Sequence, residues 1–399
     1  MLRRGWQTIV LPYSGWAIFD QEGGSAQGRL RDRDNAVTTL SLIDLLRDLE
    51  PQLVVTNTVV APWGALAASI VGIPHVWFVR EFGDASQGFY FPDGRKQVLQ
   101  DVGELSTIVF ANSNAVRDEL ERFVPAGKLQ VAYPWVELDN LRVLASMPPA
   151  EQPFAENAGL RVTVVGRVTA SKGQWRVIEA IGVLAAKGVR VDVCFVGQAI
   201  DHGDDRILKR RAARLGVGDR IRFVGDQANP FAFMTAAEVC VTPSDREAFG
   251  RATLEALGVG RPVLATCTGG SAELVEDGVS GGLFGPEDVL GLARSLEKFS
   301  LDRKLAESMR QAARDRADSL MSSTLGVDDV IDLLTSASEA APATLPDSRR
   351  AWFNSLDAAA KLGAPNLLKL AVLVIRWTRR FGRLIRDPRP AILRRLGRT

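Results

Sequence analysis

The order of apolar runs along the chain is the feature that most restricts its fold. Strand-length runs alternate with helix-length periodic segments, and this alternation predicts parallel sheets covered by helices. The first series of runs is Thr8–Leu11, Leu53–Thr56, His75–Val79 and Thr107–Ala111, and the second is Arg161–Val165, Arg190–Val196, Ile221–Val224, Val239–Thr242 and Pro262–Ala265.

The two series are separated by a stretch with little periodicity. Residues 146–158 contain three prolines and mostly small or polar side chains, as a linker between domains does. A length of 399 residues is also enough for two hydrophobic cores. We therefore predict an α/β fold of two Rossmann-like domains that face a cleft, with residues 1–145 in the first domain and 159–325 in the second.

Cysteine usage and the lack of long apolar segments limit the compartment. Cys194, Cys240 and Cys267 all lie in apolar, strand-like runs, which favours buried free thiols in a reducing cytoplasm over disulfides. The basic start is followed by a short apolar run that Pro12 interrupts, so we predict no signal peptide. No uncharged apolar stretch reaches the roughly 18 residues of a membrane span.

A first cluster of polar residues follows the apolar run Arg161–Val165. Gly166, Arg167, Lys172 and Gly173 crowd one turn between a strand and a helix. Glycines allow a ligand to approach the backbone, and the two cations can neutralise a diphosphate. Taken alone the signal is weak, because basic residues in such turns are usually solvated.

A second cluster follows Val239–Thr242. Phe249 and Gly250 lie where a helix should begin, so their backbone N–H groups can receive a phosphate. Glu255 lies about a turn and a half inside that helix, within reach of a ribose hydroxyl pair. Glu247 would lie over the transferred sugar, where a carboxylate orients hydroxyls and stabilises an oxocarbenium-like charge. The alternative is a pair of solvated glutamates.

A third turn, with Gly269 and Gly270, follows Pro262–Ala265 and again leads into a helix. The carboxyl ends of parallel strands meet at one edge of a sheet, so the three turns should lie together there. Three such clusters after strands of one sheet are improbable by coincidence. Together they predict a binding site for a nucleotide diphosphate sugar.

These motifs resemble those of the family 4 retaining glycosyltransferases, whose GT-B fold carries an E-x7-E motif between a strand and a phosphate-binding helix. By that resemblance Glu247 contacts the donor sugar, Glu255 the ribose, and Arg167 and Lys172 the diphosphate. The resemblance implies no cofactor and no metal. Asp204-Asp205, the nearest approach to a carboxylate pair, is expected to be solvated.

The first domain resembles the acceptor half of that family through Pro51–Thr58, Gly72–His75 and Ala111–Ser113. Where many members have a histidine beside the reacting sugar, this chain has Arg80 and Glu81. We expect Arg80 to clamp a phosphate or the acceptor and Glu81 to orient or deprotonate an acceptor hydroxyl, with a surface ion pair as the alternative. His75 lies inside the apolar run, which favours a role in the core.

The two ends of the chain depart from the family pattern. Residues 1–11 resemble the end of the family's first helix and its second strand, so we expect that the first strand and helix are missing, through truncation or with loss of activity. Residues 326–339 resemble the helix that crosses back to the first domain.

Residues 340–399 hold thirteen Lys and Arg against three Asp. If residues 366–386 form a helix, their cations would lie on one face and their leucines and aromatic residues on another. Such a helix suits an anionic membrane surface, although packing on the body or a link to a further domain is equally compatible. No motif for nucleic acid accompanies the charge.

Together with the motifs, the resemblance implies a retaining, metal-independent glycosyltransferase of the hexosyltransferase type. We expect transfer of a sugar to a hydroxyl of a glycan or lipid-linked glycan, in the synthesis of a cell-surface polysaccharide or glycolipid, at the inner face of the membrane. Two alternatives remain open: a nucleotide-sugar epimerase of the same architecture, and an inactive scaffold that binds a sugar nucleotide.

Overall fold

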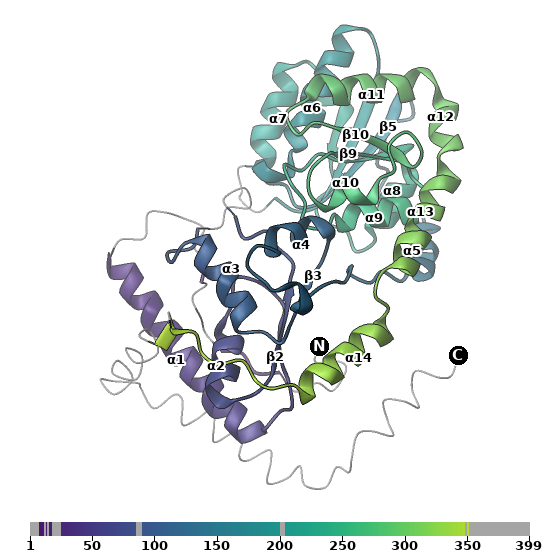
Figure 1. Ribbon diagram of the computed structural model, residues 1–399. Coiled ribbons are helices and arrows are strands. Elements are labelled where there is room, and N and C mark those ends of the chain that lie inside the picture. The colour runs from purple at the N-terminus through teal and green to yellow at the C-terminus, as the bar shows by residue number, and fades with distance from the viewer. Residues whose placement is uncertain are drawn as a thin grey trace.

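The computed structural model describes residues 8–11, 13, 16–17, 25–84, 90–199, 204–347 and 349–350. Within these ranges the chain forms two α/β domains, each built on a parallel sheet (Figure 1). The two-domain α/β architecture predicted from the alternating runs is confirmed. The predicted amphipathic segment 366–386 and most of segment 340–399 lie outside the described residues.

The first domain holds a four-stranded parallel sheet in the order β1-β2-β3-β4. Its strands are β1 (Val54–Thr56), β2 (His75–Val79), β3 (Ile108–Ala111) and β4 (Leu129–Val131), and its helices are α1 (Ser25–Leu49), α2 (Trp63–Val71), α3 (Arg95–Glu104), α4 (Asn114–Leu120) and the short 3-10 helix η3 (Ala126–Lys128). The apolar run Thr8–Leu11, which we predicted as a strand, is not part of this sheet, and its residues Ile9 and Val10 are exposed. An apolar run becomes a strand only where a neighbouring strand pairs with it, and among the described residues β1 pairs with β2 alone.

The second domain holds a six-stranded parallel sheet in the order β10-β9-β8-β5-β6-β7. Its strands are β5 (Leu160–Val165), β6 (Val191–Val196), β7 (Ile221–Phe223), β8 (Val239–Thr242), β9 (Val263–Thr266) and β10 (Gly281–Phe284). The last of these, β10, was not predicted from the sequence. Its helices are α6 (Gln174–Ala186), α7 (Asp204–Arg214), α8 (Pro230–Ala236), α9 (Arg251–Gly258), α10 (Gly270–Leu274), α11 (Val289–Leu301), α12 (Arg303–Ser308) and α13 (Arg310–Ser323), with 3-10 helices η4 (Ala170–Lys172) and η5 (Gly218–Arg220).

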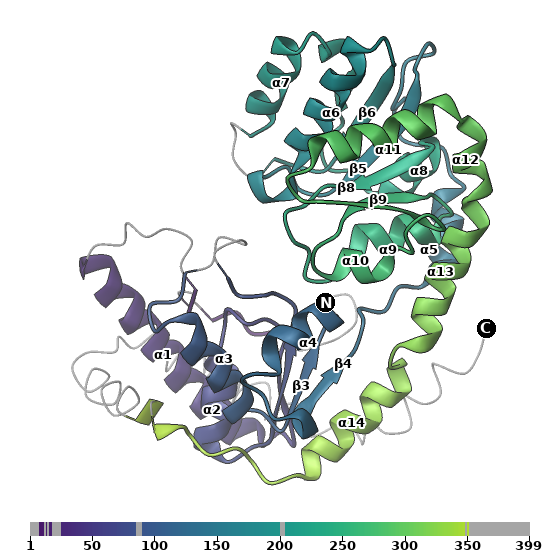
Figure 2. The same cartoon turned by 45° about the horizontal axis from the view of Figure 1, so that its top comes forward.

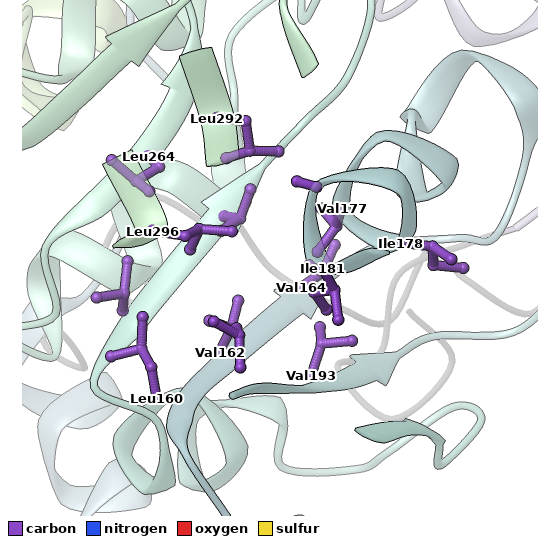
Figure 3. Packing of buried hydrophobic residues seen from close by; sticks show 14 of the residues in the cluster. Leu160, Val162, Val164, Val177, Ile178, Ile181, Val193, Leu264, Leu292 and Leu296 are labelled. Carbon is purple, nitrogen blue, oxygen red and sulfur yellow. The ribbon is translucent and has the colours of Figure 1, made fainter. Parts of the chain in front are cut away.

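The core of the second domain explains why its strands read as continuous apolar runs. Both faces of a parallel sheet are covered by helices, so both sets of side chains are buried. Figure 3 shows Val162 and Val164 of β5 beside Ile181 of α6 and Leu296 of α11, all in one hydrophobic cluster. This packing fixes the central strands, and the loops that leave their carboxyl ends are held in place with them.

Two helical segments connect the domains. Helix α5 (Leu138–Ala145), which we assigned to the first domain, packs against α8 and α9 of the second. Its buried side chains Leu138 and Leu141 share a cluster with α9. The chain therefore changes domain before Leu138. Farther along, α13 and then α14 (Val327–Glu339) run along one side of both domains (Figure 2), and α14 packs on β2.

The cysteines divide into two environments. Cys194 in β6 and Cys240 in β8 are buried free thiols, and burial raises the pKa of each to about 12. Cys267 is exposed, so our prediction that it is buried was wrong. It comes directly after β9, where the chain leaves the core. In the part of the chain that the structure describes, no helix is long and apolar enough to cross a membrane.

Candidate functional site

The three polar clusters lie at the carboxyl edge of the second sheet, after β5, β8 and β9. The loops after β5 and β8 are joined, since the Asp245 N–H donates to the carbonyl of Ser171 at 2.9 Å. The loops after β8 and β9 are joined by the Gly270 N–H, which donates to the carbonyl of Glu247 at 2.7 Å. All three predicted turns therefore form one surface.

Glu247 and Lys172 meet at the centre of this surface. The Lys172 Nζ lies 2.6 Å from Glu247 Oε1, and the hydroxyl of Ser244 donates to the same oxygen at 2.6 Å. Both charged side chains are partly exposed, at 31% for Lys172 and 17% for Glu247. A cation and a carboxylate thus lie side by side, and both are partly open to solvent.

Glycine is required where the loops cross. Gly269 has a φ of 65°, and a Cβ there would collide with the backbone of Glu247. Gly270, next in the chain, would collide with the backbone of Phe249. These two glycines let the turn after β9 lie directly on the Glu247 loop, and no residue with a side chain fits there without moving the loop.

Helix α9 begins in the same place without a side-chain cap. Its N-cap residue is Gly250, with φ 93°, so the first N–H groups of the helix have no side-chain acceptor from the cap. The side chain of Phe249 is buried in the core and tilts against Tyr133, at 5.2 Å between ring centroids. The side chain of Phe249 therefore anchors the loop at the start of the helix.

Glu255 is one turn into α9 and almost fully covered. Its only hydrogen-bond partner among the described side chains is Arg251, whose Nε donates at 2.7 Å. Burial raises the pKa of the Glu255 carboxyl. The arginine is 69% exposed, so it can move aside. A buried carboxylate with one loose partner is suited to accept hydrogen bonds from a ligand.

Arg167 is exposed and has no side-chain partner among the residues that the structure describes. It lines an open pocket of about 430 Å³ at the carboxyl ends of β5, β6 and β7, together with Gly197, Gln198 and Asp226. Our reading of the sequence missed this pocket. Gly197 and Asp226 also follow strands, so the rule that revealed the three clusters applied to them as well.

In the first domain, Arg80 and Glu81 come directly after β2. Glu81 accepts hydrogen bonds from the Thr58 hydroxyl at 2.8 Å and the Val59 N–H at 3.1 Å, which fixes the loop after β1. The Nε of Arg80 donates to Asn57 at 2.7 Å, and its side chain is exposed. The two residues do not pair with one another through their side chains. Glu81 has a structural partner for each oxygen, whereas the outer end of Arg80 stays available.

His75 is buried, as the apolar run predicts. Its ring nitrogens lie 2.8 Å from the Thr56 hydroxyl and 3.2 Å from the Ser106 hydroxyl. Burial lowers the pKa of His75 to about 3, so the ring is neutral at physiological pH. These contacts favour a role in the core.

The two domains touch through a carboxylate that the sequence did not single out. Glu273 of α10 crosses to the start of α4, where it accepts hydrogen bonds from the backbone N–H groups of Asn114 and Ala115 at 3.0 and 3.1 Å. The Asn114 amide and the Tyr133 hydroxyl donate to it at 2.7 Å each. Burial, followed by the hydrogen bond to Glu273, raises the pKa of the Tyr133 hydroxyl.

A second contact starts beside Glu247. The guanidinium of Arg246 lies 3.5 Å from the centre of the Phe82 ring and pairs with Asp84 at 3.1 Å and Glu119 at 2.8 Å, all in the first domain. The hydrogen bond from Arg246 lowers the pKa of Glu119. Two of the three loops, those after β8 and β9, are thus tied to the first domain, by Arg246 and Glu273.

The described side chains were also compared with the requirements of a metal site. The described residues contain no group of three or more His, Cys, Asp or Glu side chains that could hold a metal ion. Asp204 and Asp205 begin α7, and Asp205 pairs with Lys209 at 2.9 Å on the surface.

Comparison with known proteins identifies the class. Residues 3–140 match the family described as Glycosyltransferase Family 4, and residues 151–316 match Glycosyl transferases group 1. Together these matches cover about three quarters of the chain. The chain belongs to the family 4 glycosyltransferases, and its fold is GT-B.

The relatives and structures that it resembles fit this class. A D-inositol 3-phosphate glycosyltransferase of Streptomyces avermitilis is 32% identical over 240 residues, which cover 54% of this chain and 50% of the relative. CapM, a capsular polysaccharide biosynthesis glycosyltransferase of Staphylococcus aureus, is 25% identical over 42% of this chain and 44% of its own. The chain spans about half the length of the curated relatives it matches.

Among solved structures, Anabaena Alr3699/HepE in complex with UDP and glucose has a TM-score of 0.62 at 24% identity, over 79% of this chain and 84% of that one. Sucrose-phosphate synthase from Thermosynechococcus elongatus has a TM-score of 0.61 at 21% identity, over 74% and 76%. These likenesses concern the fold.

Proposed function

We propose that this chain transfers a hexose-type sugar from a nucleotide diphosphate sugar to a hydroxyl group, with retention at the anomeric carbon. The observation that carries the proposal is the meeting of Lys172 with Glu247, three residues before the uncapped start of α9 at Gly250. A cation and free helix N–H groups suit a diphosphate, and a carboxylate beside them suits a sugar.

The leaving group is the nucleotide diphosphate, which gains negative charge as the bond to the sugar breaks. Lys172 and Arg167 would neutralise that charge, and the first N–H groups of α9 would donate to the phosphate oxygens. Glu247 would then accept hydrogen bonds from the sugar hydroxyls and stabilise positive charge at the anomeric carbon. The protein supplies these charges without a cofactor or a metal in this proposal.

The nucleoside half of the donor has two candidate contacts. Glu255 would bind the ribose hydroxyls, since it is buried and loosely paired. The pocket lined by Arg167, Gly197 and Asp226 is open and lies at the edge of the same sheet, so it would receive the base. Alr3699/HepE has been solved with UDP-glucose, which makes uridine donors the first to test.

On the acceptor side, Arg80 offers an exposed guanidinium at the mouth of a pocket that also includes Phe78, Asn112 and Trp135. We propose that Arg80 receives a negatively charged group of the acceptor and that Glu81 acts by fixing the loop. A glycan or lipid-linked glycan at the inner membrane face, in polysaccharide or glycolipid synthesis, is the acceptor we favour. The names of several relatives add phosphorylated inositol as a candidate.

The experiment is a transfer assay with a panel of nucleotide diphosphate sugars and the acceptors named above. We expect one donor to raise Tm and to release free nucleotide diphosphate only when an acceptor is present. The anomeric configuration of the product, measured by NMR, should match that of the donor, and EDTA should leave the rate unchanged. The variant Glu247→Gln should lower kcat by about 100- to 1000-fold while it still binds donor.

The other outcomes are distinct. Release of nucleotide or change of the sugar without an acceptor would indicate an epimerase. Donor binding without either reaction would indicate a scaffold. The variant Glu276→Gln, at an exposed position near α10, is the matched control and should keep full activity.

A further inference from the structure

The turn between α9 and β9 contains an arginine in an unusual environment. Arg261 is only 8% exposed, and its Nη2 donates to the carbonyl of Thr235. Its Nε and Nη1 are buried without a hydrogen-bond partner among the described residues. A buried charge with unused donors is costly unless an opposite charge compensates it.

The charges around Arg261 make its environment less favourable. Burial first, and then the neighbouring arginines Arg310, Arg161 and Arg314, lower the pKa of this guanidinium to about 10. Arg310 and Arg314 are one turn apart on α13, which packs along α9. The Nε of Arg310 is also buried and unpartnered within the described chain. The side chain of Arg314 lies against Gly260.

The nearby carboxylates are engaged elsewhere. Glu238 pairs with Arg303 and Arg161, Asp318 pairs with Arg142, and Asp315 accepts from Gln311. Glu307 reaches Arg310 at 3.4 Å, but its side chain is 73% exposed. In the described parts of the chain, none of these acidic groups pairs with Arg261.

The carbonyls at the end of α9 do not compensate the charge either. Backbone N–H groups of Val259, Gly260 and Arg261 donate to the carbonyls of residues 255, 257 and 256. The carbonyl of Gly258 accepts from Arg142 at 3.1 Å. The usual attraction between an arginine and a helix C-terminus is therefore already satisfied by other donors.

We propose that Arg261, Arg310 and Arg314 form a binding site for a tetrahedral oxyanion, either a phosphate ion or the phosphoryl group of a larger molecule. Such a group has enough acceptors for the unused donors, and its charge offsets the three cations. The side chain of Arg310 is 40% exposed and Arg314 is exposed, so both can move to admit the ligand.

The site is separate from the donor site. Helix α9 starts at the donor surface and ends at this turn, so its eight residues hold the two about 12 Å apart. An oxyanion here would tie α13 to the turn before β9, and this role does not depend on the proposed transfer reaction.

The test is the change in Tm on addition of inorganic phosphate, against chloride at the same ionic strength. Because Arg167 and Lys172 can also bind phosphate, the measurement is made in the double variant Arg167→Ala/Lys172→Ala. We expect phosphate to raise Tm by roughly 5 °C at a hundredfold excess over Kd. Adding Arg261→Met should abolish the rise, whereas adding Arg210→Met, at an exposed position on α7, should not.

Two variants test the proposed oxyanion site further. Arg261→Met should be at least as stable as the parent without phosphate, since it removes an uncompensated buried charge. If it fails to fold, Arg314→Gln decides, and its affinity for phosphate should be about tenfold weaker than that of the parent. A phosphate response equal to that of chloride, or unchanged in Arg261→Met and Arg314→Gln, overturns the proposal. Tighter binding of glycerol 3-phosphate than of phosphate identifies a phosphoryl group on a larger ligand, and the reverse identifies the free ion.

Discussion

At the scale of single residues, the two glutamates of the second domain differ in environment. Glu247 is partly exposed and paired with Lys172, so its charge is compensated before any ligand arrives. Glu255 is buried on α9 with an exposed arginine as its partner. Glu247 is therefore suited to contact the sugar, on which positive charge develops during transfer. Glu255 is suited to hold the ribose hydroxyls firmly.

The burial of Glu255 leads to a prediction about stability and pH. Because its pKa is raised in the folded chain, ionisation costs stability as the pH rises from the unfolded value of about 4.3 through the folded value. In the absence of donor at pH 7.5, Glu255→Gln should raise the free energy of unfolding by on the order of 1 kcal/mol. Thermal unfolding at pH 4 and 7.5 measures this gain, which should be absent at pH 4.

The same substitution should weaken donor binding about tenfold, since a carboxylate is a stronger acceptor than an amide. Calorimetric titration with the donor measures the affinity. A variant that is less stable than the parent at pH 7.5, or that binds donor equally well, would contradict the role given to Glu255.

At the scale of elements, the contact of α10 with α4 joins the donor surface to the first domain. Glu273 follows the Gly269-Gly270 turn by three residues and accepts four hydrogen bonds from Asn114, Ala115 and Tyr133. A movement of the turn would therefore be transmitted to α4. The contact thus ties the loop after β9 to the first domain.

Loss of this contact should open the cleft. In Glu273→Ala we expect a larger radius of gyration in small-angle X-ray scattering and a kcat lowered about tenfold, because the two halves of the site are held together less often. Donor affinity should change little, since the donor residues all lie in the second domain. Glu276→Ala is the control, and an unchanged kcat in Glu273→Ala would refute the coupling.

At the scale of the whole molecule, the second domain has its own core. Its hydrophobic clusters draw their buried members from residues 136–321, including α5 and α13. Every residue that we assign to the donor also lies in this range. The first domain supplies Arg80 and the contacts across the cleft.

We therefore predict that a fragment of residues 136–323 folds alone and binds donor without transferring sugar. It should unfold in one cooperative transition. Its donor affinity should be within about threefold of that of the full chain, because it keeps all the proposed donor contacts. A threefold change corresponds to a difference of about 0.7 kcal/mol in the free energy of binding. Circular dichroism and calorimetric titration check both points. A fragment that is unfolded, or folded but unable to bind nucleotide, would show that the first domain completes the donor site.

Local pattern in the sequence determined much of this protein. Apolar periodicity located the central strands of both sheets, because a buried parallel strand must be apolar on both faces. The rule that ligands bind after the strands then located Lys172, Glu247 and Glu255. Their positions after apolar runs predicted Lys172 and Glu247 on loops that follow two strands of one sheet, and Glu255 in the helix after the second loop.

The tertiary structure decided what depends on contacts between distant segments. The pairing of Glu273 with Asn114 joins residues 159 apart, and no periodicity reports it. Helix α5 lies in the second domain because its apolar face fits α8 and α9, and Cys267 is exposed because β9 ends before it. Arg261 lies in an ordinary turn in the sequence. Only the packing of α13 on α9 surrounds it with other arginines, because burial and electrostatic environment depend on the whole fold.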